Sequence, residues 1–181
     1  SRQPVCSSYS QLMNLKKKIL AEHSKTNCTQ IITWVGNNQQ RFDELFNLFL
    51  NDEYRVVQRT SWPLSNLVIA HPQLIRNHLG KLLKNLQQPG LHDAVKRNTI
   101  RILQVIDIPE KHHGTVMNLC FDYLISPAEK PAVKAFSLTV LENLSKHYPD
   151  IKQELKTIIE DRWEFETPAF HSRARKILKQ L

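Results

Sequence analysis

The stretch that decides the fold is VKRNTIRIL, residues 95–103. One helical face is formed by the positions i, i+4, i+7 and i+11, which are Val95, Thr99, Ile102 and Ile106. Side chains at this spacing share one side of an α-helix. Ile100 and Leu103 widen the apolar stripe beyond that face. The stretch therefore predicts a helix that packs on two sides, as a middle element of a stack does.

The same apolar pattern returns every 38 residues along the chain. A shift of 38 places Ile102 on Leu64 in one direction and on Val140 in the other. A second register connects Leu45 and Leu83 with Phe121 and Ile159. Apolar identity carried through several positions at a fixed step is the signature of a helical repeat array.

Prolines and helix-capping residues divide the chain into helices. Asp107-Ile-Pro-Glu110 and Ser126-Pro-Ala-Glu129 have the capping-box spacing, with a proline just inside the expected helix. Thr167 before Pro168 is a third expected N-cap. With the apolar periodicity, these signals predict helices at residues 10–22, 25–36, 38–50, 52–70, 73–87, 91–106, 110–125, 128–147, 150–164 and 168–181.

The pattern resembles HEAT-type repeats, which are antiparallel helix pairs whose second helix opens with a valine and a basic residue. The resemblance is carried by VVQRTSWPLSNLV (56–68), AVKRNTIRILQVI (94–106), AVKAFSLTVLENL (132–144) and FHSRARKILKQL (170–181). More narrowly, the sequence resembles small bacterial HEAT-like proteins without settled biochemistry. The resemblance implies an all-α fold, a right-handed α-α superhelix of about four helix pairs.

We expect one helical-repeat domain over residues 1–181. Residues 1–36 form its N-terminal capping segment, and residues 37–181 form repeats of about 38 residues. A lone helix pair cannot bury its apolar face, so successive pairs must stack and share one apolar spine. The polar faces of the first and last helices suit them to the ends of the stack.

Composition narrows the classes of function. Only four glycines are present, and no glycine-rich phosphate-binding loop appears. The three cysteines lack metal-type spacing and do not suggest a disulfide framework, which favours a reducing, cytoplasmic location. No apolar run is long enough to span a bilayer. We expect a monomer with no cofactor, no metal and no membrane partner.

Positive charge is concentrated in one quarter of the chain. The net charge is +8, and residues 54–101 hold eight basic residues against the single acid Asp93. In stacked helix pairs the second helices line the concave side, so their equivalent positions lie side by side. Seven positions are therefore candidate contacts on the concave face, namely Arg59, Trp62, Lys96, Arg97, Arg101, Lys134 and Arg173.

Two interpretations of these basic rows remain open. They could form a positive strip that binds an acidic peptide or follows phosphates. They could instead be structural, because opening Lys and Arg residues in HEAT units make contacts between neighbouring repeats. Gln58, Ala135 and Ser172 interrupt the rows, which favours the structural role.

No catalytic constellation stands out, so we expect a non-enzymatic scaffold that holds a protein or peptide partner on its concave face. The alternative is a nucleic-acid-binding protein. Some DNA glycosylases for alkylated bases are built from HEAT-like repeats and use basic residues, tryptophans and an aspartate. Residues of these types are present as Trp34, Trp62, Trp163 and Asp161, but they match no active site of that family residue by residue.

Overall fold

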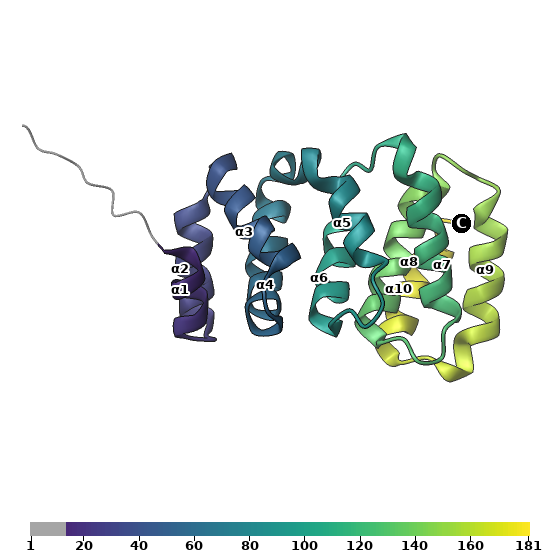
Figure 1. Cartoon of the computed structure of the whole chain (residues 1–181). Coiled ribbons are helices and arrows are strands. Elements are labelled where there is room, and N and C mark those ends of the chain that lie inside the picture. The colour runs from purple at the N-terminus through teal and green to yellow at the C-terminus, as the bar shows by residue number, and fades with distance from the viewer. Residues whose placement is uncertain (1–13) are drawn as a thin grey trace, which may run out of the picture.

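The computed structural model describes residues 14–181, which contain ten α-helices and no strand (Figure 1). The helices are α1 (Leu15–Ala21), α2 (Lys25–Val35), α3 (Gln39–Asn51), α4 (Tyr54–Ala70), α5 (Leu79–Leu86), α6 (Asp93–Leu103), α7 (His113–Ile125), α8 (Pro131–Ser145), α9 (Ile151–Arg162) and α10 (Pro168–Leu178). Three short 3-10 helices, η1 (Pro72–His78), η2 (Glu110–His112) and η3 (Trp163–Phe165), lead into or out of them. The expected start of the first helix, residues 10–13, lies outside the described residues.

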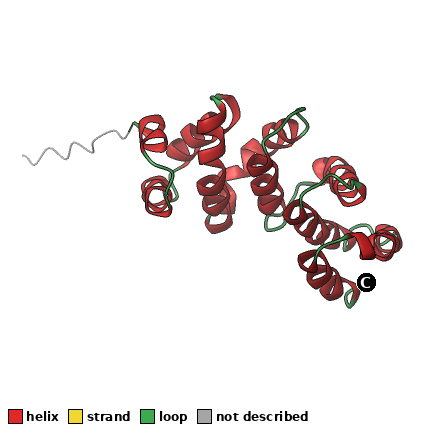
Figure 2. Cartoon of the chain, turned by 90° about the horizontal axis from the view of Figure 1, so that it is seen from below, coloured by secondary structure: helices red, strands yellow, loops and turns green. Residues whose placement is uncertain are grey.

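The helices form a stack of antiparallel pairs behind the α1/α2 segment. The second helices of successive pairs pack on one another, α4 on α6, α6 on α8 and α8 on α10. Figure 2 shows the stack as an arc, with α4, α6, α8 and α10 on its inner side and α3, α5, α7 and α9 on its outer side. The predicted all-α solenoid of four helix pairs and an N-terminal segment is confirmed.

Positions 38 residues apart occupy the same environment. Leu64, Ile102 and Val140 are each at most 1% exposed and face the same apolar spine. Burying a side chain of this size contributes about 1.5–3 kcal/mol to folding. The shared burial explains why the apolar pattern, and not the sequence as a whole, repeats along the chain.

A buried hydroxyl follows the same register. Ser61, Thr99 and Ser137 donate hydrogen bonds to the carbonyl oxygens four residues back, of Val57, Val95 and Val133, at 2.9, 2.8 and 2.7 Å. All three are at most 1% exposed. A buried hydroxyl without a partner is costly, and the bond to the preceding turn removes that cost. The inner helices can therefore carry a small polar residue within their apolar face.

The expected capping residues are correct at one site and wrong at two. Thr167 accepts a hydrogen bond from the Phe170 N–H at 3.3 Å and caps α10. Ser126 instead ends α7, and α8 begins at Pro131 without a side-chain cap. Asp107 also lies outside any helix, since η2 begins only at Glu110. The capping-box spacing fails at these two sites because each helix begins three or more residues after the expected cap.

Candidate binding surface

The predicted basic residues all lie on the inner helices α4, α6, α8 and α10, but Lys134 is engaged in a buried ion pair. Only 2% of the lysine is exposed, and its Nζ lies 2.5 Å from the Glu166 carboxylate. The same ammonium donates to the Leu124 carbonyl at 3.2 Å, and Arg162 binds the same oxygen of Glu166 at 2.8 Å. The expectation that Lys134 faces solvent is therefore wrong, because its aliphatic stem and its charge both lie between two repeats.

Lys96 makes the equivalent contact one repeat earlier. Its Nζ lies 3.0 Å from the carboxylate of Glu129, whose side chain is 8% exposed. The ammonium also lies 5.2 Å from the centroid of the Tyr123 ring, within range of a cation–π contact. Lys96 and Lys134 thus each reach from an inner helix to an acid in the connection that precedes the next inner helix. These two lysines connect neighbouring repeats.

Three of the predicted arginines also bind other helices. Arg59 donates to the carbonyls of Ile19 and Leu20 at 3.2 and 3.1 Å, near the end of α1. Arg173 donates to Gln104 at 3.2 Å and to the Thr139 hydroxyl.

The third of these arginines, Arg101, takes part in a polar contact between α4 and α6. It donates to the Ser65 hydroxyl at 2.9 Å. Ser65 in turn donates to the Asn98 side chain at 2.9 Å. All three arginines are partly buried in these contacts, which leaves less of their charge for an external ligand.

Arg97 and Trp62 remain exposed on adjacent inner helices. Trp62 is 41% exposed, and Arg97 makes no ion pair or hydrogen bond with another described side chain. Trp62 does not belong to the apolar core, unlike Ile100 at the equivalent position of α6, which is fully buried.

The tryptophans considered for a glycosylase do not come together. Trp34 on α2 packs under Arg41, whose guanidinium carbon lies 4.6 Å from the ring centroid. Trp163 on η3 stacks on His171 at 4.2 Å. Figure 1 places α2 and α9, which precedes η3, at opposite ends of the stack. The rings of Trp34 and Trp163 thus serve separate local contacts, and of the three tryptophans only Trp62 lies on an inner helix.

The two acids that bind Lys96 and Lys134 were not predicted from the sequence as their partners. Glu129 was expected to belong to a capping box, and Glu166 was assigned no role. A signal was available, because Lys96 precedes Glu129 by 33 residues and Lys134 precedes Glu166 by 32. A lysine and an acid repeated at nearly one spacing indicate a contact between successive repeats.

Neither a metal-binding cluster nor a membrane-spanning helix is present in residues 14–181. No cluster of three His, Cys, Asp or Glu side chains there is arranged to bind a metal ion. No helix among these residues is long and apolar enough to cross a membrane.

Comparison with known proteins gives one result. A family model described as a HEAT repeat domain matches residues 15–181, which is nearly the whole chain. No curated protein and no solved structure matches the sequence.

Proposed function

The chain belongs to the HEAT repeat domain family, and from this premise we propose that it is a non-catalytic scaffold that holds a protein or peptide partner on its inner helices. The contact surface centres on Trp62 of α4 and Arg97 of α6. Lys134 is left out of this surface because it is buried.

The exposure of Trp62 is the observation that carries the proposal. A tryptophan that is 41% exposed in the middle of a helix leaves apolar area in water. Tryptophan and arginine are the residue types that most often dominate the energy of protein interfaces. Trp62 and Arg97 therefore offer one apolar anchor and one cation to the same partner.

The contacts of the other basic residues favour a protein partner over a nucleic acid. A phosphate backbone is bound by a row of accessible cations, and each neutralised phosphate adds to the salt dependence of binding. Lys96 and Lys134 are instead engaged with Glu129 and Glu166. The row of cations that would bind successive phosphates is thus largely engaged in ion pairs within the protein itself.

The proposal is tested by crosslinking pull-down from the native lysate, with bound proteins and nucleic acids both quantified by mass spectrometry. We expect Trp62→Ala and Arg97→Glu each to reduce recovery of a protein partner by about tenfold, equivalent to about 1.4 kcal/mol. Lys156→Glu is the matched control for Arg97→Glu, because Lys156 is exposed on the outer helix α9. Phe165→Ala is the control for Trp62→Ala, because Phe165 is 73% exposed on η3.

Recovery that is the same for all four variants would contradict an inner-face binding mode. A gel shift with DNA or RNA at low salt would favour the nucleic-acid alternative, provided that Arg97→Glu abolishes it and that affinity falls steeply with salt. The absence of such a shift, together with loss of the protein partner in Trp62→Ala, supports the scaffold.

A further inference from the structure

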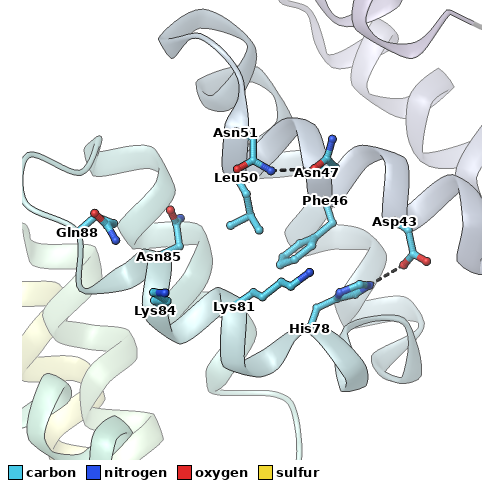
Figure 3. Close-up of a pocket in the computed structure, with 10 residues that line it drawn as sticks. All are labelled: Asp43, Phe46, Asn47, Leu50, Asn51, His78, Lys81, Lys84, Asn85 and Gln88. Carbon is cyan, nitrogen blue, oxygen red and sulfur yellow. Dashed lines mark hydrogen bonds and ion pairs between the residues drawn. The ribbon is translucent and has the colours of Figure 1, made fainter.

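A polar groove lies on the outer side of the stack, between α3 and α5 (Figure 3). The inner helices α4 and α6 pack directly on each other, but the outer helices beside them leave an open volume of about 640 Å³. Its wall is formed by ten residues, and neither the inner-face contacts nor the family match accounts for them.

Four carboxamide side chains line this groove from both helices. Asn47 and Asn51 come from α3, Asn85 comes from α5, and Gln88 follows it. Asn51 donates to Asn47 at 2.8 Å, and the remaining amide groups of the four bind no other described residue. A carboxamide both donates and accepts hydrogen bonds, as the main chain of an extended peptide does. The groove can therefore bind peptide backbone on both of its sides.

The charge of the groove is positive. Lys81 and Lys84 are exposed on α5 and form no ion pair with another residue of the described chain. Figure 3 shows Lys81 reaching past Phe46 toward His78. A ligand lying on the exposed carboxamides would therefore meet two unpaired ammonium groups.

The single acid of the groove, Asp43, is already engaged at one end. His78 lies 2.6 Å from its carboxylate, and Gln39 donates to it at 2.7 Å. Partial burial acts to raise the pKa of Asp43, but the hydrogen bonds from Gln39 and His78, with the charges of His78 and Lys81, hold this pKa below its ordinary value. The His78 ring also stacks on Phe46 at 4.6 Å, which fixes this end of the groove.

The dimensions match a short extended peptide. From Asp43 to Asn51 a helix rises by about 12 Å, the length of roughly four extended residues. Lys81 and Lys84 are at i and i+3, so their Cβ atoms lie about 5–6 Å apart. Alternate side chains of an extended peptide lie on one face about 7 Å apart. Two carboxylates at alternate positions would each meet one lysine.

We propose that the groove between α3 and α5 binds an extended acidic peptide segment with carboxylates at alternate positions. Its backbone lies on the carboxamides, and its two carboxylates pair with Lys81 and Lys84. Phosphates of a nucleic acid only accept hydrogen bonds, so they would leave the carboxamide oxygens without donors. The groove lies opposite the inner helices, so variants of this surface leave Trp62 and Arg97 intact.

In the test, the capped peptide Ala-Glu-Ala-Glu-Ala is titrated into the full protein chain, and binding is followed by nitrogen-15 NMR of the protein. We expect shifts confined to α3, α5 and the other residues that line the groove, including its side-chain amides. The neutral peptide Ala-Gln-Ala-Gln-Ala should bind about tenfold more weakly, since charge-assisted hydrogen bonds contribute more than neutral ones.

Three double variants locate the contacts. Lys81→Glu with Lys84→Glu should weaken binding at least about tenfold. Lys176→Glu with Lys179→Glu, which has the same spacing and charge change at the end of α10, should leave affinity within about twofold. Asn51→Ala with Asn85→Ala should weaken binding of the acidic peptide, while the dependence of its affinity on salt concentration should remain unchanged. Circular dichroism checks that each variant folds, as expected for exposed or partly exposed side chains.

Shifts that fall mainly outside α3, α5 and the residues that line the groove, equal binding of the neutral peptide, or equal loss in both lysine pairs would overturn the proposal. A single-stranded oligonucleotide that shifts the same amides at lower concentration than the acidic peptide would also overturn it, in favour of a phosphate ligand.

Discussion

At the scale of single residues, the lysine inside the stack shows how a charge can be buried. Lys134 and Glu166 are 2% and 6% exposed at their side chains, so both charges have lost most of their water. Removal of that water is costly, and the pair persists only because several partners share it. Arg162 and the Leu124 carbonyl supply the remaining contacts.

The two halves of this ion pair should tolerate substitution differently. Glu166→Gln leaves both Lys134 and Arg162 without their carboxylate, and we expect a loss of about 3–5 kcal/mol in the free energy of unfolding. Lys134→Met leaves Glu166 paired with Arg162 and replaces the buried stem with an apolar one, so the loss should be smaller. Urea unfolding of both variants measures the difference. Equal losses would mean that Arg162 does not hold Glu166 in the variant.

The buried thiol of Cys120 predicts a pH dependence of stability. Burial raises the pKa of this thiol to about 12, from the ordinary value of 9.0, although a hydrogen bond with Ser137 acts against the shift. The unfolded chain therefore loses the proton first. This contribution to stability is complete below pH 9 and is lost as the pH rises toward 12, at up to about 1.4 kcal/mol per pH unit.

Urea unfolding from about pH 8 to about pH 10.5 should show a shallower decline in stability for Cys120→Ala than for the unchanged protein. Comparison of the two slopes removes the contribution of lysines and of the tyrosines other than Tyr123, whose raised pKa depends first on burial and in part on the charge of Cys120. Parallel slopes would show that the thiol ionises equally in both states.

At the scale of elements, the contact between α4 and α6 combines apolar packing with a polar chain. Ser65 accepts from Arg101 and donates to Asn98, each at 2.9 Å, and Asn98 donates to the Ala94 carbonyl at 2.8 Å. The side chains of Ser65 and Asn98 are buried. Such a chain fixes the relative position of two helices, because each group depends on its neighbour for satisfaction.

A double-mutant cycle tests this dependence. Ser65→Ala should cost about 1–3 kcal/mol, because it leaves the buried side-chain oxygen of Asn98 unpaired. Asn98→Ala should cost less, because the Ser65 hydroxyl can then donate to the Trp62 carbonyl, 3.0 Å away. The double variant should lose less free energy of unfolding than the sum of the two single losses, by at least about 0.5 kcal/mol. The reason is that the second substitution removes a group whose partner the first had already removed. Additive losses in the free energy of unfolding would contradict a shared network.

At the scale of the whole molecule, each repeat packs mainly on its neighbours, although the bond from Arg173 to Gln104 reaches past one repeat. The helices α6 and α8 each lie between two other inner helices, whereas α4 packs on α6 and on the α1/α2 segment, and α10 packs on α8 alone among the inner helices. The stability of such a stack is a sum of local and nearest-neighbour contributions. The centre should therefore open less often than the ends.

Hydrogen exchange read by mass spectrometry should show this gradient. We expect the amides of α6 and α8 to exchange most slowly, and those of α1 and α9 to exchange at least about tenfold faster, a difference of about 1.4 kcal/mol in local opening. Uniform protection across the helices would show that the chain opens as one cooperative unit.

The sequence by itself determined the helices and their stacking. The 38-residue step placed Leu64, Ile102 and Val140 in one spine, because apolar periodicity is a local property of each helix. The capping boxes at Ser126 and Asp107 were wrong, since the same residue types also end helices and form connections. Helix boundaries follow from competing local contacts, which a spacing rule does not rank.

Only the tertiary structure decided which basic residues face a ligand. Lys134 and Arg97 are alike in the sequence, yet one is buried against Glu166 and the other is exposed. The groove between α3 and α5 could not be predicted from the sequence either, because Asn51 and Asn85 line the same groove only when two repeats stack. A side chain's partner in this fold comes from the next repeat, about a whole repeat away in the chain, so its environment is a property of the stack and not of its own helix.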